Sequence, residues 1–166
     1  MKDLRATLIY TMCAALLVVS KEMLAFLPNV ELVSFLLIIF ALHFRLAGCI
    51  WISVLFSFIQ TILYGVGTWT PMYFIVWTLL VCVVYVLRPI LKSDIPCACF
   101  SGLFGLSFGL LFAIPYFLMS IQTGVAYYLR GIPYDLIHGI ANFLLMLVLF
   151  NKVNQVLAKL ASTYKL

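Results

Sequence analysis

Residues 71–88 read PMYFIVWTLLVCVVYVLR, and Arg88 is the only charged residue in this run. The hydrocarbon core of a bilayer takes about 20 apolar residues of helix, so the run predicts a membrane-spanning helix. The whole chain agrees, because 66% of its 166 residues are hydrophobic and only 9% are charged, whereas soluble domains carry about 25% charged residues. We therefore expect an all-α membrane protein without a separate soluble domain.

Charged residues, prolines and glycines divide the chain into six apolar segments. We expect helices over residues 5–25, 30–44, 47–64, 71–88, 98–121 and 133–158. Together they predict one domain, residues 1–166, a bundle of six transmembrane helices in contact with membrane lipid. The first segment starts with basic residues, but it lacks a small-x-small cleavage site and five more apolar runs follow. It is predicted to be a retained helix rather than a signal peptide.

The lysines and arginines predict the orientation, because cytoplasmic loops are enriched in these residues. With the N-terminus inside, the inner side carries eight of them: Lys2, Arg5, Arg45, Arg88, Lys92, Lys152, Lys159 and Lys165. Only Lys21 and Arg130 fall outside. Six helices then place both termini in the cytoplasm, as expected for a multi-pass protein of the cell membrane.

Polar and aromatic residues gather at the predicted outer end, where membrane insertion alone does not require them. The candidate substrate-binding residues are Glu22, Asn29, Tyr73, Trp77, Arg130, Asp135, His138 and Asn142. Glu22 lies in an apolar stretch, and ionisable groups there usually face a protein interior or a water-filled cavity. Trp77 lies two turns into its helix, too deep for an interfacial aromatic belt. It faces either a pocket or a packed interior.

Asp135, His138 and Asn142 have the spacing i, i+3, i+7, which places them on one helical face. Two interpretations stay open. Pro133 suits the first turn of a helix and Asp135 suits its positive end, so the face could be structural, with its polar groups hydrogen-bonded to neighbouring helices. Alternatively, the face lines a ligand cavity open to the outside. Glu31 also suits the first turn of its helix, where the macrodipole favours a carboxylate.

Catalytic and metal-binding motifs are missing from the sequence. It contains no P-loop, GxSxG or HExxH, so an enzyme is not expected. His43 and His138 are the only histidines and are expected toward opposite sides, and the five cysteines form no CxxC pair. No metal site and no cofactor are therefore predicted. The net charge of +5 is spread over single residues, which fits the positive-inside bias and not a nucleic-acid surface.

Small residues predict two close helix contacts. Gly105-x-x-x-Gly109 allows two backbones to approach, and packing within the bundle is expected. Thr7, Thr11 and Ala15 form a second stripe on the first helix. That stripe packs either internally or against another subunit.

Three segments resemble a known family. They are Lys21-Glu22 with LPNVELVS at residues 27–34, YGVGTW at residues 64–69 leading to Trp77, and GIPYDLIHGIANF at residues 131–143. In these segments, in size and in the expected six helices, the chain resembles the substrate-binding S components of energy-coupling factor (ECF) vitamin transporters. The likeness is closest to a subgroup that includes cobalamin-type members.

The resemblance implies a specific function. An S component of the prokaryotic plasma membrane binds a vitamin or vitamin precursor near the outer face. It then docks on a transmembrane T component that two cytoplasmic ATPases drive. The cavity would lie between the outer halves of the fourth to sixth helices, with the connection 22–29 as a lid.

The resemblance also implies a docking surface on the first helix. The family often presents an Ala-x-x-x-Ala stripe to the T component, and here Thr11-x-x-x-Ala15, with Thr7, takes its place. The alternative function is a self-sufficient secondary carrier or channel. Secondary carriers often show inverted repeats, and no repeat is evident in this sequence.

Overall fold

The computed structural model describes residues 2–166, with side chains from Leu4 onward, and it is all-helical, with no strand among those residues. The six helices are α1 (Lys2–Met23), α2 (Val33–His43), α3 (Leu46–Tyr64), α4 (Trp69–Leu87), α5 (Asp94–Met119) and α6 (Ile121–Tyr164). The predicted all-α class is confirmed. The first, third and fourth helices start and end within about three residues of their predicted bounds, a difference that is normal at frayed helix ends.

Five of these helices, all except α2, are long and apolar enough to cross a membrane. The 11 residues of α2 span only about 16 Å, about half of the ~30 Å hydrocarbon core. The segment predicted as a second span over residues 30–44 therefore contains a helix that is too short to cross a membrane by itself. Every residue from Val33 to Ala41 is buried, so α2 is a short central helix inside the bundle.

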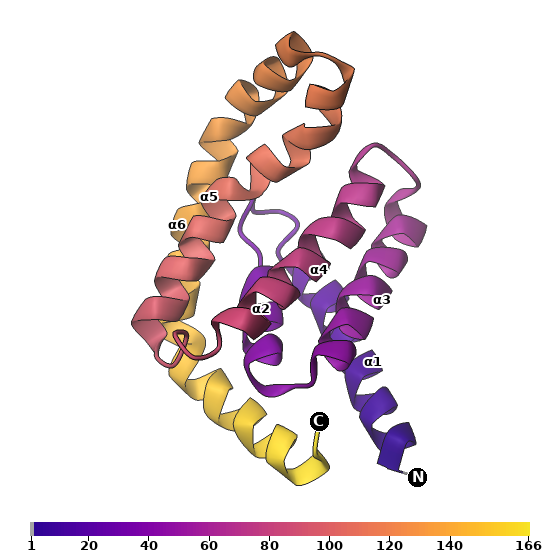
Figure 1. Ribbon diagram of the computed structural model, residues 1–166, viewed down its shortest axis with the longest axis vertical. Helices are drawn as coiled ribbons and strands as arrows, with labels where there is room; N and C mark the ends of the chain where they lie inside the picture. The colour runs from indigo at the N-terminus through magenta and orange to yellow at the C-terminus, as the bar shows by residue number, and fades with distance from the viewer. Residues whose placement is uncertain (1) are drawn as a thin grey trace.

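Figure 1 shows α1 to α4 gathered on one side and α5 with α6 as a long hairpin on the other. The hairpin packs closely where glycines meet. A Cβ atom at Gly105 would lie 2.8 Å from the Cα atom of Gly139. The close approach predicted for the glycines of the fifth helix is confirmed, and it occurs within the bundle.

The last helix differs most from its predicted range of 133–158. It begins at Ile121 because the Ser120 hydroxyl accepts a hydrogen bond from the Thr123 N–H at 3.0 Å, which caps the first turn. Pro133 lies inside the helix, so the expectation that Pro133 and Asp135 mark its first turn is wrong. With 44 residues, α6 is about 66 Å long, roughly twice the hydrocarbon thickness.

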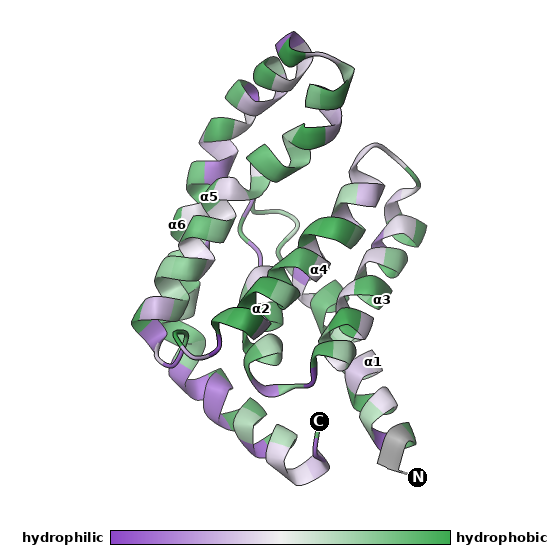
Figure 2. Cartoon of the chain, in the orientation of Figure 1, coloured by the Kyte–Doolittle hydropathy of each residue, from purple (hydrophilic) through white to green (hydrophobic). Residues whose placement is uncertain are grey.

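The final turns of α6 bend beneath the other helices, and both chain termini lie at that end (Figure 1). Figure 2 shows that this part of α6 is its most hydrophilic. Polar contacts hold it there: His43 Nε2 lies 2.6 Å from Asn154 Oδ1, and Asn151 Nδ2 lies 3.5 Å from Asp94 Oδ2. At the same end, Arg88 donates to the carbonyl oxygens of Ala41 and Phe44.

Candidate ligand-binding site

The connection between α1 and α2, residues 24–32, folds as a series of turns. Leu27 N–H donates to the Leu24 carbonyl at 2.9 Å, and Val30 N–H donates to the Leu27 carbonyl at 3.4 Å. Asn29 has φ of 56°, in the left-handed region that asparagine tolerates better than most residues. Pro28 and Asn29 thus turn the chain back toward the bundle just before α2.

Glu31 closes this connection onto α2. The sequence suggested that Glu31 lies in the first turn of its helix, but it precedes Val33, where α2 begins. Its carboxylate accepts from the Val33 N–H and from the Ser34 N–H, the latter at 3.0 and 3.1 Å. These amides have no partner within a helix, so the carboxylate satisfies them and also faces the positive end of α2.

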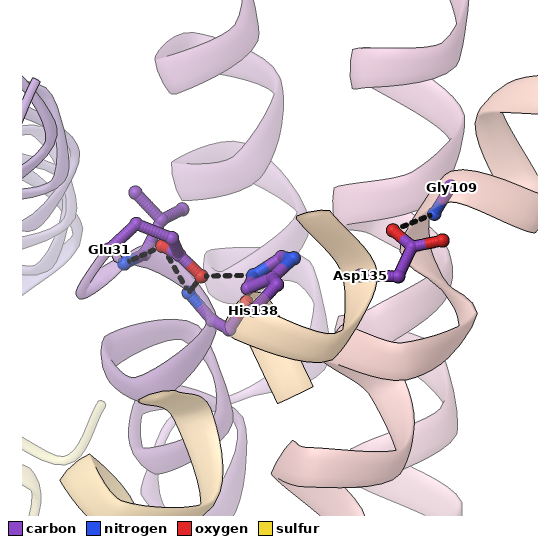
Figure 3. Close-up of polar contacts among 6 residues, drawn as sticks. Glu31, Gly109, Asp135 and His138 are labelled. Carbon is purple, nitrogen blue, oxygen red and sulfur yellow. Dashed lines mark hydrogen bonds and ion pairs between the residues drawn. The ribbon is translucent and has the colours of Figure 1, made fainter. Parts of the chain in front are cut away.

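The same carboxylate reaches α6. His138 Nε2 lies 3.1 Å from Glu31 Oε1, and the two side chains face each other in Figure 3. A carboxylate only accepts hydrogen bonds, so the imidazole Nε2–H donates. Both side chains are largely buried, at 5% exposure for His138 and 16% for Glu31. Residues 107 positions apart are thereby joined, and the connection 24–32 is fastened to the middle of the bundle.

A cavity of about 300 Å³ lies under this connection, and we call it the connection cavity. It is lined by Lys21, Leu24, Ala25, Leu27, Pro28, Asn29, Val30, Glu31, Val33, Tyr64, Tyr73, Trp77, Phe108 and His138. Several aromatic rings in its wall pack edge to face. The Tyr73 and Trp77 ring centroids are 5.8 Å apart at 89°, and the Phe108 and His138 centroids are 4.9 Å apart at 74°. Trp77 is 2% exposed, and its Nε1–H has no partner among the described residues.

A second, larger cavity of about 840 Å³ lies within the α5–α6 hairpin, and we call it the hairpin cavity. It is lined by Asn29, Phe108, Gly109, Phe112, Tyr116, Gln122, Thr123, Ala126, Tyr127, Arg130, Gly131, Tyr134 and Asp135. Asn29 and Phe108 line both cavities, so the two are neighbours on either side of these side chains. Together they form a mostly apolar site with a few polar groups, as is typical of small-molecule sites.

Six of the eight candidate substrate-binding residues line these cavities. Tyr73, Trp77 and His138 line the connection cavity, Arg130 and Asp135 line the hairpin cavity, and Asn29 lines both. Asp135 and His138 share a helix face but have different partners. Figure 3 shows Asp135 turned toward Gly109 of α5 and His138 turned toward Glu31. The predicted polar face is therefore buried, and Asp135 and His138 line different cavities.

Glu22 and Asn142 line neither cavity. Glu22 is exposed, and its carboxylate accepts from Tyr64 Oη at 2.6 Å and from Gln60 Nε2 at 3.2 Å, which joins the ends of α1 and α3. Asn142 is fully buried, and both polar atoms of its amide lack a partner among the described residues. Asn142 is therefore buried, as its position on the polar helix face predicts, but it does not line a cavity that a ligand could occupy.

The candidates did not include every lining residue, and Phe108 and Lys21 are two that they omit. Phe108 separates the cavities and belongs to a series at helical spacing, Phe104, Phe108 and Phe112, whose neighbouring rings are 6.0 and 4.6 Å apart. The i, i+4 spacing of these rings could have indicated an inward aromatic face. Lys21 lines the connection cavity with its ammonium group 4.4 Å from the Tyr64 ring centroid. The sequence identified Lys21 as an outer basic residue and as part of a segment that carries the resemblance, but not as a candidate binding residue.

On α1, the side chains of Thr7, Thr11 and Ala15 are exposed, whereas the adjacent Ala14 is fully buried. The stripe therefore faces away from the bundle.

Among the residues whose side chains are described, no three His, Cys, Asp or Glu groups come together as metal ligands. Comparison with known proteins provides no relative, because no family model, curated protein or solved structure matches this chain.

Proposed function

We propose that this chain is the membrane-embedded substrate-binding subunit of an ECF-type importer. In this proposal it captures a vitamin or vitamin precursor at the outer face of a prokaryotic plasma membrane. It delivers the ligand through a T component that two ATPases power. The observation that carries the proposal is the connection cavity, an aromatic and polar chamber covered by a turn-rich segment that Glu31 fastens to His138.

The chemistry of the connection cavity supports capture of a flat, ring-bearing ligand. Tyr73, Trp77 and Phe108 provide aromatic faces and edges, against which a ring packs in the offset or edge-to-face arrangements that aromatic pairs prefer. Glu31, His138 and the unpartnered Trp77 Nε1–H provide polar groups that fix orientation. A volume of about 300 Å³ is at the small end for ligand sites. A cobalamin-type ligand would require both cavities to open into one.

The exposed small-residue stripe on α1 supports a partner in the membrane. Small side chains let helices approach closely, and such stripes are typical of helix–helix contacts in lipid. In the proposal, Thr7, Thr11 and Ala15 face the T component. Both termini lie at one end of the molecule in Figure 1, and the distribution of basic residues supports a cytoplasmic position for that end.

Purification of a tagged chain from native membranes in mild detergent tests this proposal. We expect one larger membrane subunit and two ATPases to co-purify, and native mass spectrometry of the isolated chain to detect a bound small molecule. The Ala15→Leu variant is the matched control, because it alters the exposed stripe and no cavity-lining residue. A chain that purifies alone and transports a solute in liposomes without ATPases would instead establish the carrier alternative.

A further inference from the structure

The hairpin cavity contains a carboxylate whose hydrogen bonds are only half satisfied. Gly109 N–H donates to Asp135 Oδ1 at 2.9 Å, and Figure 3 shows the other carboxylate oxygen pointing away from that contact. Asp135 Oδ2 has no hydrogen-bond partner among the described residues, although Asp135 is only 7% exposed. An unsatisfied buried acceptor costs about 1–3 kcal/mol, and more when it is charged. A donor is therefore missing from this site.

Two glycines line the cavity beside this carboxylate. Gly109 and Gly131 both line the hairpin cavity, and neither has a side chain that could cover Asp135. A Cβ atom at Gly109 would lie 2.2 Å from Asp135 Oδ2, so the carboxylate needs a glycine there. A Cβ atom at Gly131 would lie 4.0 Å from the same oxygen and would meet nothing else within that distance. Asp135 thus lines the cavity between two residues without side chains, and its unpartnered Oδ2 is buried beside Gly109.

No cation whose side chain the structure describes pairs with this carboxylate. Among the described residues, Asp135 forms no ion pair, and Arg130 on the rim of the same cavity is exposed and not bonded to it. The same cavity is also lined by aromatic rings, with Tyr116 and Tyr127 stacked at a centroid distance of 4.1 Å. A negative group beside aromatic faces favours a cation, because both the carboxylate and the ring faces attract positive charge.

We infer that the hairpin cavity is a second compartment of the binding site, in which Asp135 Oδ2 accepts a hydrogen bond from a protonated nitrogen of the ligand. The ligand class is then a two-part molecule. Its ring occupies the connection cavity, and its amine or amidine group passes Asn29 and Phe108 to reach Asp135. This inference rests on the proposed function, because it assigns part of the ligand of that binding subunit.

Fragment binding to the purified full chain tests the inference without the natural ligand. Benzylamine and benzyl alcohol have the same ring and differ in a cationic nitrogen against a neutral hydroxyl. Saturation-transfer NMR in one detergent at pH 7 would measure both affinities. We expect benzylamine to bind roughly tenfold or more tightly, since hydrogen bonds to charged groups are the stronger ones. Equal affinities, or no benzylamine binding, would overturn the inference.

Three variants assign the effect to Asp135. Asp135→Asn keeps an acceptor for Gly109 N–H and should abolish the preference for benzylamine. Gly131→Ala adds a methyl group 4.0 Å from Asp135 Oδ2 and should reduce the preference without harming the fold. Glu22→Gln removes an exposed carboxylate that lines neither cavity and should leave the preference unchanged. A preference that survives both Asp135→Asn and Gly131→Ala contradicts the inference, and Gly131→Ala decides alone if Asp135→Asn does not fold.

These outcomes separate the inference from the proposed function. An amine preference that depends on Asp135, in a chain that purifies without ATPases, would retain the site and reject the importer. Co-purification of the T component and ATPases without an amine preference would support the importer and reject the Asp135 site.

Discussion

His138 Nε2 lies 3.1 Å from Glu31 Oε1, and this contact fastens the connection 24–32 to α6. Glu31 also accepts from the first amides of α2, so one carboxylate joins three parts of the chain. The cover of the connection cavity is therefore held by a polar contact at its C-terminal end, while exposed side chains such as Phe26 and Leu27 make up its middle.

Removal of the imidazole should loosen this cover. In His138→Ala, the free energy of unfolding should fall by about 1–3 kcal/mol, because a largely buried carboxylate loses a donor. Backbone amides of residues 24–34 should exchange hydrogen faster, as measured by mass spectrometry. Glu22→Gln is the control, since Glu22 is exposed and lies outside the cavity. Unchanged exchange over residues 24–34 would show that other contacts hold the connection.

A substitution of Asn142 tests whether this residue affects the stability of the fold or the binding of a ligand. Asn142→Leu replaces an unpartnered buried amide by an apolar group of similar size, so the free energy of unfolding should rise by about 1–3 kcal/mol. Ligand affinity should stay the same, because Asn142 lines neither cavity. Unfolding in a denaturing detergent would measure the first quantity. A loss of both stability and affinity would show that the amide binds a polar group within the protein or on the ligand.

The glycine contact between α5 and α6 should not accept a methyl group. In Gly105→Ala, the new Cβ would lie 2.8 Å from the Gly139 backbone, and overpacking of this kind typically costs about 1–3 kcal/mol. Gly131→Ala on the same hairpin has open space and should be neutral or slightly stabilising, since alanine favours helix. Comparison of the two unfolding curves checks this. Equal effects would mean that the hairpin is looser than the structure indicates.

Large side chains on the two faces of α1 should have different effects. Ala15→Leu places a large side chain on the exposed face and should weaken assembly with the T component while the isolated chain remains folded. Ala14→Leu, at a fully buried position, should destabilise the isolated chain itself. Co-purification yield and thermal unfolding of each variant measure the two effects. Normal assembly of Ala15→Leu would move the docking surface elsewhere.

Orientation can be tested by cysteine labelling. In a background without the native cysteines, a cysteine at Gly67 should react with a membrane-impermeant maleimide in intact cells. A cysteine at Ser93 should react only after the membrane is opened. The reason is the eight-to-two distribution of basic residues, which predicts that the loop between α4 and α5 lies inside. The reverse labelling pattern would put both cavities on the cytoplasmic side.

Helix positions were largely predictable from the sequence, because apolar runs long enough to span a bilayer are a strong signal. The run that includes Trp77 is one example, predicted over 71–88 and observed as Trp69–Leu87. The short α2 was not predictable from hydropathy, since a helix buried in protein and one facing lipid are both apolar. The start of α6 was missed because Pro133 resembles a first-turn proline, whereas the actual cap is Ser120.

The candidate site was predictable in composition but not in arrangement. Helical spacing correctly placed Asp135 and His138 on a buried face. Their partners could not be deduced, since Gly109 and Glu31 contact them across 26 and 107 positions of sequence. Periodicity shows which side of a helix turns inward, but it contains no information about which neighbour it meets. That information comes from tertiary packing alone.

The length of α6 has a mechanical consequence. One continuous helix of about 66 Å runs from the rim of the hairpin cavity to the C-terminal turns, and it is fastened at His138, well inside its length. The helix bends before its final turns, and contacts of Asn151 and Asn154 hold those turns beneath the other helices. Its hydrogen-bonded backbone therefore links the wall of the hairpin cavity to the end of the molecule that contains both termini. A lengthwise displacement at one end cannot be absorbed between them without breaking helical hydrogen bonds.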